Sequence, residues 1–186
     1  MVQVFVGEQR KLYVFHKGLL TSRCPYFEKC LAPSFPEGRN NEVVLEEENC
    51  EEFDYFFDWI YTEQVEVTDK IPIAALYVIA NRFCMEGFEK SIVNALPKYF
   101  RYHEAPIEQL APLVNHNLCE SPLAITLMER IAYELDHQQR DIASKSSTAL
   151  FNVLGQGEAW TTFFEILEKE IYRKAMDMHS KFESDP

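Results

Sequence analysis

The alternation of hydrophobic and polar residues at the start of the chain predicts a β-hairpin. Hydrophobic residues occupy every second position over residues 2–6, and residues 12–15 combine aliphatic and aromatic side chains that favour strands. The segment Gly7-Glu8-Gln9 between these stretches favours a turn. We therefore expect two strands that pair with each other.

Short helices and a third strand are predicted next. Residues 17–32 fit two short helices, because Pro25 is tolerated in a first helical turn and the apolar residues that follow share one face: Tyr26, Phe27, Cys30 and Leu31. Residues 33–41 are rich in Pro, Gly and Asn and predict a loop. Residues 42–46 predict a short strand.

The clearest helix signal follows this strand. Asn49 is a suitable N-cap, and Glu52 stands three residues later, as in a capping box. The next apolar residues have helical spacing, so their face is expected to be buried: Phe53, Phe56, Phe57 and Ile60. A brief extended piece is expected at residues 65–67.

Two further helices are predicted up to Pro97. Thr68 or Asp69 is a suitable cap for the first, whose apolar residues are Leu76, Ile79, Ala80 and Phe83. Gly87 is expected to break it, and the second helix then carries Phe88, Ile92 and Leu96.

Beyond about residue 104 the pattern predicts helices alone. Ser121-Pro122 favours a helix start, and one face then carries Ala124, Leu127, Met128, Ile131 and Leu135. Residues 137–147 are polar and predict a loop, and a short helix is expected to end near Gly155. A final amphipathic helix is expected to bury Trp160, Phe163, Phe164, Leu167 and Ile171.

Composition and charge narrow the class of protein. With 186 residues, 47% of them hydrophobic, the chain can form one ordinary domain with a helical extension. Its net charge of −12 repels phosphate backbones, so we expect no nucleic acid as partner. No apolar run approaches the roughly 20 residues that cross a bilayer, and the first residues lack a basic leader, so we expect neither a membrane span nor a signal peptide.

The cysteines indicate a reducing compartment. Their number is odd and they form no CxxC pair: Cys24, Cys30, Cys50, Cys84 and Cys119. Free thiols fit the cytoplasm and/or the nucleus better than a secreted disulfide framework. Cys24 and Cys30 have no second pair at metal-ligand spacing, so we expect no metal site.

The chain has no recognisable catalytic motif. The sequences GxSxG, HExxH and GxxxxGK[ST] are all absent. We therefore expect no cofactor and no enzymatic activity. A cysteine-dependent hydrolase that uses His116 and Cys119 as a thiol–imidazole pair is the alternative of a different class, although no motif supplies its third group or an oxyanion hole.

Negative charge is concentrated in one segment. From residue 40 to residue 69 there are eleven acidic residues and no Lys or Arg: Glu42, Glu46, Glu47, Glu48, Glu51, Glu52, Asp54, Asp58, Glu63, Glu66 and Asp69. One interpretation is a solvated helix face. The other is a docking surface for a basic partner, where such charge raises association rate and specificity.

Several motifs follow one another in order between residues 15 and 62. They are Phe15-His16-Lys17-Gly18-Leu19-Leu20, Ser22-Arg23-Cys24-Pro25-Tyr26-Phe27, Ser34-Phe35-Pro36-Glu37-Gly38, Val43-Val44-Leu45 and the aromatic helix from Phe53 to Thr62. Together they resemble the BTB/POZ domain, most closely that of fungal BTB proteins. The resemblance implies an α+β BTB/POZ fold, a short β-sheet flanked by a helical bundle, over residues 1–100. Residues 101–186 would form an all-α C-terminal extension that packs on this domain or presents a second surface.

The resemblance also implies a function, which is protein–protein interaction. BTB adaptors of cullin-type ubiquitin ligases use a hydrophobic-x-acidic triplet near the end of the aromatic helix, and Val67-Thr68-Asp69 is similar to it. Tyr61, Val67 and Asp69 are therefore the candidate protein-binding residues, with a cullin as candidate partner. A scaffold in transcription-linked or other assemblies, without a ligase role, is the alternative.

The resemblance bears on the oligomeric state as well. Many animal BTB domains exchange an N-terminal strand and helix within a dimer, whereas this chain starts almost at its first core strand. We therefore expect a monomer or a weak homodimer.

Overall fold

The computed structural model describes residues 1–183 apart from 69, 138–148 and 156. The chain divides into two compact units, Met1–Pro97 and Lys98–Pro186. Among the described residues, no helix is both long enough and apolar enough to cross a membrane.

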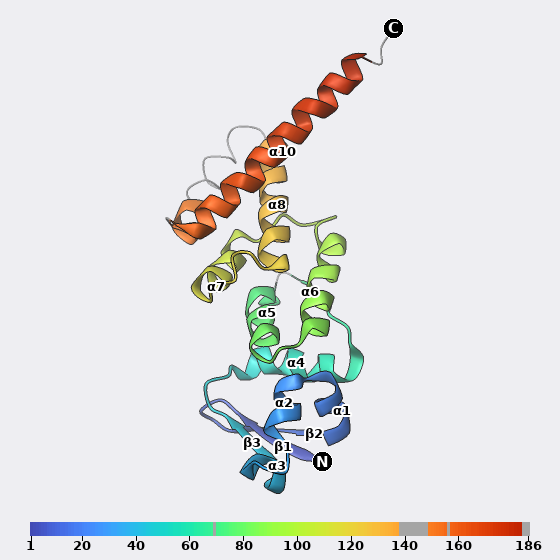
Figure 1. The fold of residues 1–186 in the computed structure, drawn as a ribbon, viewed down its shortest axis with the longest axis vertical. Helices are drawn as coiled ribbons and strands as arrows, with labels where there is room; N and C mark the ends of the chain where they lie inside the picture. Colours follow the sequence, from blue (N-terminus) through green and yellow to red (C-terminus); the bar gives the residue numbers. More distant parts are fainter. Residues whose placement is uncertain (69, 138–148, 156, 184–186) are drawn as a thin grey trace. The chain divides into compact units, whose positions relative to one another are not determined.

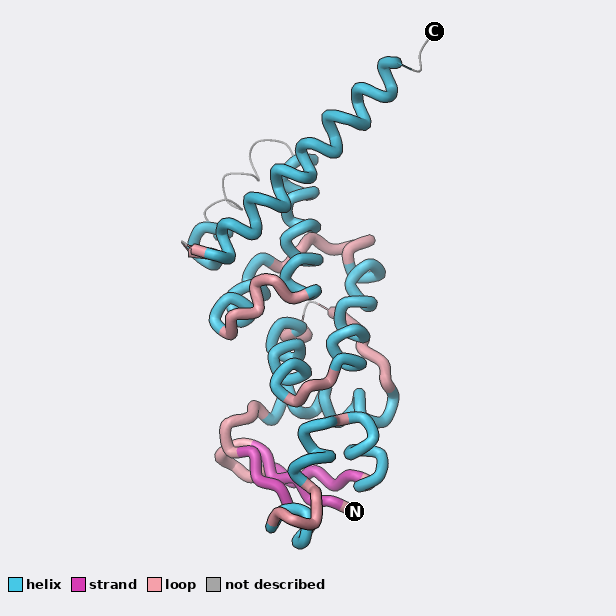
Figure 2. The backbone as a smooth tube through the Cα atoms, viewed as in Figure 1, coloured by secondary structure: helices cyan, strands magenta, loops and turns pink. Residues whose placement is uncertain are grey.

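A three-stranded sheet lies at one end of the first unit (Figure 2). Strand β1 (Val2–Val6) pairs antiparallel with β2 (Lys11–Phe15), so the predicted hairpin is confirmed. The predicted third strand is also confirmed as β3 (Glu42–Leu45), which pairs in parallel with β1 and gives the order β2-β1-β3. The alternate residues of β1 and β2 face the helices and are buried: Val2, Val4, Val6, Tyr13 and Phe15.

The helices α1 (Lys17–Arg23) and α2 (Pro25–Cys30) confirm the predicted helix pair. Pro25 stands in the first turn of α2, where its missing N–H removes no helix hydrogen bond. Leu20, Phe27 and Leu31 are buried beneath these helices. In Figure 1 both helices lie beside the sheet, and α4 lies next to them.

The predicted loop over residues 33–41 is wrong in part, because it contains helix α3 (Pro36–Asn40). Pro36 begins this single turn and Asn41 ends it in the left-handed conformation, with φ of 52°. A Cβ atom at Gly38 would lie 2.1 Å from the Ala32 carbonyl oxygen. The close approach of two backbone segments therefore requires glycine at this position.

Helix α4 (Cys50–Thr62) begins as predicted. The Asn49 side chain accepts hydrogen bonds from the backbone N–H groups of Glu51 (2.8 Å) and Glu52 (3.2 Å). Phe53, Phe56 and Ile60 are fully buried, as expected. Phe57 is only half-buried, because it packs at the edge of the aromatic cluster between Phe15 and Tyr61.

Trp59 is buried as well, although the predicted face of α4 did not include it. Its ring stacks on Phe88 with 4.9 Å between the ring centroids. The helix that carries Phe88 therefore covers a face of α4 that the sequence analysis expected to be exposed to solvent.

Helices α5 (Ile73–Arg82) and α6 (Glu86–Tyr99) differ from the prediction at their ends. A cap at Thr68 or Asp69 is wrong, since α5 begins after Pro72, and Asp69 lies outside the described residues. The break after α5 falls at Cys84, with φ of 57°, whereas Gly87 lies inside the first turn of α6. Helix α6 passes Pro97, which falls in its last turn.

The described part of the second unit is helical. It contains the 3₁₀ turn η1 (Ile107–Gln109), α7 (Leu110–Asn115), α8 (Pro122–His137), a helical stretch at 149–154 and α10 (Glu158–Glu183). The predicted helix start is confirmed, because the Ser121 hydroxyl accepts the Ala124 N–H at 3.3 Å. The predicted polar loop lies outside the described residues except for His137, which ends α8.

The apolar faces of α8 and α10 behave differently. On α8, Ala124, Leu127, Met128 and Ile131 are buried as predicted, with Leu135 half-buried. On α10 the prediction is wrong for Phe164 and Ile171, which are 43% and 53% exposed, although Phe163 is buried. Helix α8 (16 residues) packs on only one stripe of α10 (26 residues), so the apolar residues of α10 outside that stripe stay at the surface.

Candidate protein-interaction surface

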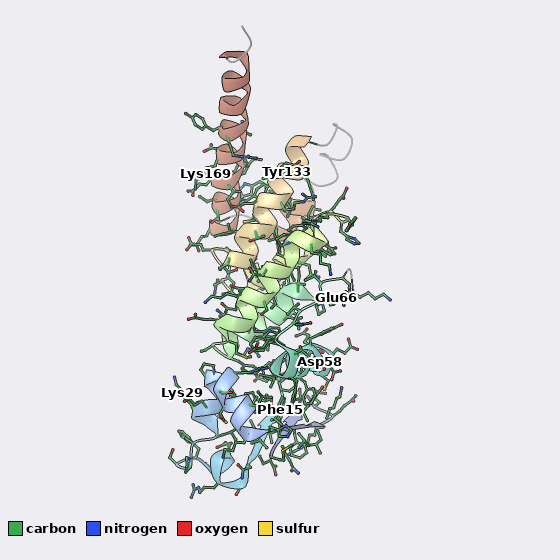
Figure 3. The ribbon with its side chains drawn as sticks, turned by 90° about the vertical axis from the view of Figure 1, so that its right-hand side faces the viewer. Phe15, Lys29, Asp58, Glu66, Tyr133 and Lys169 are labelled. Atoms are coloured by element: carbon green, nitrogen blue, oxygen red, sulfur yellow. The ribbon has the colours of Figure 1, made fainter. Side chains whose placement is uncertain are left out.

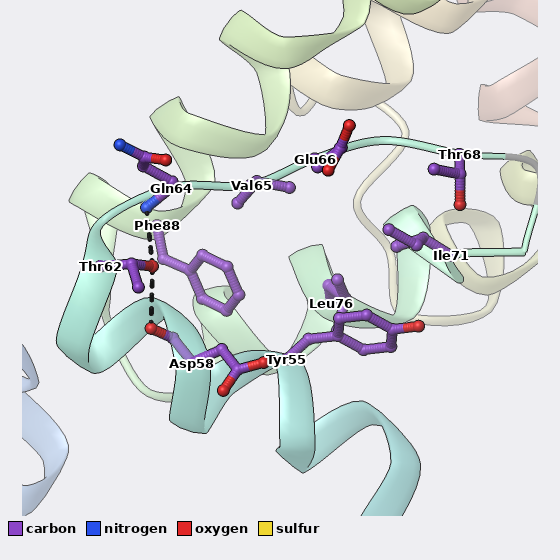
Figure 4. Close-up of a pocket in the computed structure, with 10 residues that line it drawn as sticks. All are labelled: Tyr55, Asp58, Thr62, Gln64, Val65, Glu66, Thr68, Ile71, Leu76 and Phe88. Atoms are coloured by element: carbon purple, nitrogen blue, oxygen red, sulfur yellow. Dashed lines mark hydrogen bonds between the residues drawn. The ribbon is translucent and has the colours of Figure 1, made fainter.

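An open groove of about 360 Å³ lies in the first unit between the end of α4, the segment 63–72 that follows it, and the starts of α5 and α6 (Figure 4). We call it the linker groove. Its ten lining residues are Tyr55, Asp58, Thr62, Gln64, Val65, Glu66, Thr68, Ile71, Leu76 and Phe88.

The floor of the linker groove is apolar. Leu76 and Phe88 are buried in the core, while Val65 and Ile71 on the linker are half-buried. Phe88 is supported from behind by the stacked ring of Trp59. An apolar floor in a rigid setting gives a partner side chain a place where burial is favourable.

The linker is held by local hydrogen bonds. The Thr62 hydroxyl donates to the Asp58 carbonyl at 2.9 Å and accepts the Gln64 N–H at 3.2 Å (Figure 4). Glu63, between them, has the left-handed backbone that ends α4. At the far end the Ile71 N–H donates to the Thr68 carbonyl at 3.1 Å. The rim of the groove is therefore shaped by the backbone.

The rim of the linker groove carries negative charge that no basic side chain neutralises among the described residues. Asp58 and Glu66 are exposed at its rim, and no Lys or Arg is among its lining residues. Neither carboxylate has an ion pair within the described part of the chain. Lining residues with unpaired acids and no base favour a partner that carries positive charge beside an apolar side chain.

Other acids of the same segment are already neutralised. Lys11 Nζ lies 2.7 Å from Asp54 Oδ1, Arg23 lies 3.1 Å from Glu63, and Arg82 pairs with the buried Glu48. Partial burial opposes ionisation of Asp54, but hydrogen bonds from Lys11 and Tyr13 hold its pKa below the ordinary value. The acidic segment therefore divides into acids that stabilise the fold and acids that remain free.

Of the predicted binding residues, the two that the structure describes, Tyr61 and Val67, do not line the groove. The Tyr61 hydroxyl lies 3.2 Å from His16 Nδ1 and accepts the His16 N–H at 3.3 Å, and its ring stacks on Phe15. Val67 is half-buried in the linker but does not line the groove, and Asp69 lies outside the described residues.

Sequence reasoning missed Val65, Ile71 and Phe88 as lining residues. Isolated apolar residues in a segment rich in acids were the available signal for Val65 and Ile71. Phe88 carried no such signal, because its helical spacing predicts a core position.

The alternative catalytic pair is not assembled. Cys119 is buried, and burial raises the pKa of its thiol, whereas a nucleophilic cysteine needs a lowered pKa. His116 is exposed at the end of α7, and no hydrogen bond joins the two side chains in the described structure. The described residues also contain no group of His, Cys, Asp or Glu arranged to hold a metal ion.

Comparison with known proteins identifies the class that this fold defines. A family model of the BTB/POZ domain matches residues 2–99, more than half of the chain. The chain belongs to the BTB/POZ family, and its three-stranded sheet with surrounding helices is the expected α+β fold with an all-α extension. A BTB/POZ domain is a protein-interaction module.

A curated relative is similar to about half of the chain. Kelch-like protein 40 of Xenopus tropicalis is 27% identical over 90 residues, which are 48% of this chain. The aligned part spans 14% of that relative's length. The similarity therefore concerns a small portion of the relative. The finer likeness to fungal members stays a prediction.

Proposed function

We propose that this chain is an adaptor that binds a cullin-type ubiquitin ligase scaffold through the linker groove. Membership in the BTB/POZ family supports a role in protein binding. The observation that carries the proposal is an apolar floor between two unpaired carboxylates, located where the resemblance to cullin adaptors puts the contact. The adaptor would act without a cofactor, in the cytoplasm or nucleus, as a monomer or weak homodimer.

Two kinds of residue in the groove would contribute to binding in different ways. An apolar side chain of the partner would be desolvated against Val65, Ile71 and Phe88, and this burial would supply affinity. Asp58 and Glu66 would attract basic groups of the partner, which mainly raises the association rate.

The binding residues predicted from the sequence are neighbours of groove residues along the chain. Val67 and Asp69 continue the linker beyond Glu66, and Tyr61 stands one turn after Asp58 on α4. We propose them as contacts at the border of the groove.

Calorimetric titration against the N-terminal part of the host's cullin tests the proposal. Val65→Arg should weaken binding by at least about tenfold, since roughly 1.4 kcal/mol corresponds to that factor. Val14→Arg is the matched control, because Val14 is 39% exposed on β2 and does not line the groove. It should bind like the wild type.

Two outcomes would contradict the proposal in different ways. If the wild type releases no heat at micromolar concentration, the chain is no cullin adaptor, and a scaffold without a ligase role takes its place. If Val65→Arg binds as tightly as Val14→Arg, the partner is right but the linker groove is not the site.

A further inference from the structure

The sheet of the first unit has an outer face that is unusually apolar. When one face of a sheet packs on the core, the residues of the other face are usually polar, because they meet solvent. Here large apolar side chains occupy outward-facing positions on all three strands: Phe5, Leu12, Val14 and Val44. Leu12, Val14 and Val44 are exposed, and Phe5 is half-buried. We call these four residues the outer sheet patch.

The strand register places these side chains next to one another. Phe5 on β1 is paired with Leu12 on β2 and with Val44 on β3, so the three form one row across the sheet. Neighbouring strands lie about 4.8 Å apart, which makes the row continuous. Val14 stands in the next row, where it is paired with Gln3. A second surface that covers this row gains free energy by removing apolar area from water.

The outer face also carries one charge of each sign. The guanidinium carbon of Arg10 lies 5.1 Å from the centre of the Phe5 ring. Glu42 is exposed on β3, at the other edge of the sheet, and is paired with Gln3. Neither charged group forms an ion pair within the described part of the chain. Both charges are therefore available to a second molecule.

Arg10 has a backbone conformation that usually belongs to glycine. It ends the turn from β1 to β2 with φ of 52°, and its N–H donates to the Gly7 carbonyl at 2.9 Å. Glycine adopts this conformation without steric cost, whereas other residues rarely do so. The chain thus has arginine where glycine would relax the turn, and the result is a cation held against Phe5.

We propose that the outer sheet patch is the contact surface of a weak homodimer, in which two copies pack face to face. A two-fold axis brings the same surface of both copies together, so such a surface must be complementary to itself. In the register, Arg10 and Glu42 flank Phe5 on a diagonal. An axis midway between them places Arg10 of each copy opposite Glu42 of the other, so two ion pairs form at once.

Charge and size both favour a second copy in weak association. The net charge of −12 makes most of the chain repel another copy, so association needs a surface that carries both signs. Strands of four or five residues present only a small face, which suits a weak dimer. The patch shares no residue with the linker groove, and Figure 3 shows Phe15 of β2 well apart from Glu66 of that groove. Self-association and cullin binding are therefore separate properties.

Charge reversals in the full chain test the inference by sedimentation velocity at micromolar to millimolar concentrations. The wild type should shift from monomer to dimer as its concentration rises. Arg10→Glu and Glu42→Arg should each weaken the dimer by at least about tenfold, or roughly 1.4 kcal/mol, because like charges then face each other. An equimolar mixture of these two variants should associate again, since both contacts of the mixed dimer join opposite charges.

Two further variants complete the test. Lys29→Glu makes a matched charge reversal at an exposed residue of α2 and should associate like the wild type. Val14→Arg, which leaves the linker groove intact, should weaken the dimer. A wild type that stays monomeric throughout, a dimer that both single reversals leave intact, or a mixture that fails to associate would each overturn the inference. No cullin is present in these measurements, so their outcome does not depend on the adaptor role.

Discussion

The two units use similar apolar patterns in different ways. In the first unit the aromatic residues of strands and helices close into one cluster, in which Phe15, Phe27, Phe53, Phe56 and Phe83 are all fully buried. In the second unit the aromatic residues near the start of α10 contact one another, yet Phe151 and Phe164 remain 51% and 43% exposed.

The difference follows from the kinds of element present. A sheet covered by helices buries the inner faces of both layers, so that each aromatic ring has neighbours on several sides. Two packed helices share only one stripe, and the remaining apolar residues stay at the surface. An apolar helical pattern therefore predicts a face, but the number of neighbouring elements determines how much of that face is buried.

The largest expected effect on stability comes from replacing one aromatic residue in each unit. Phe56→Ala should lower the free energy of unfolding by about 3–5 kcal/mol, because it leaves a cavity in the cluster. Phe164→Ala, the matched change on α10, should alter it by less than about 1 kcal/mol, since the ring is largely exposed. Urea unfolding followed by circular dichroism measures both. Similar losses in the two variants would show that the second unit is packed as tightly as the first.

A smaller loss of stability is expected where two backbone segments of the first unit pack closely. Gly38→Ala should destabilise by about 1–3 kcal/mol, as overpacking does, because the added methyl group meets the Ala32 carbonyl oxygen. Gly18→Ala is the control, since no atom lies within 4 Å of a Cβ there and α1 gains a better helix former. A neutral Gly38→Ala variant would mean that α3 moves freely away from Ala32.

The smallest effect concerns the acids of the first unit and has opposite signs at two positions. The pKa of Asp54 is lowered from 3.8 in the folded state, so its stabilisation is complete above that value and is lost as the pH falls through the folded pKa. Burial, and then the charge of Glu48, raise the pKa of Glu52 above 4.5. Its contribution is complete below 4.5 and is lost as the pH rises through the folded pKa.

Urea midpoints between pH 3 and pH 7 can separate these two acids. Asp54→Asn should lower the midpoint slightly at pH 7, and Glu52→Gln should raise it slightly, with both differences vanishing in acid. Glu51→Gln, at the neighbouring exposed acid, is the control. If both variants shift the midpoint in the same direction, the two carboxylates do not differ as described.

Local patterns in the sequence determined the hairpin, the third strand and most of the helices. Alternation over residues 2–6 and the Asn49 cap act within one turn or one strand, so they need no distant partner. The BTB/POZ resemblance was likewise carried by short, ordered motifs, and the family match over residues 2–99 confirms it. These features depend on interactions between residues close in sequence.

Tertiary structure alone decided the features that depend on distant segments. The parallel pairing of β3 with β1 and the burial of Trp59 against Phe88 each join elements that are far apart in the sequence. The linker groove has the same origin, since Val65 and Ile71 line it only because α4 and α6 bring Tyr55 and Phe88 to the linker. A sequence pattern records which side chains are apolar, whereas the other walls of a groove come from the packing of elements that the pattern cannot place.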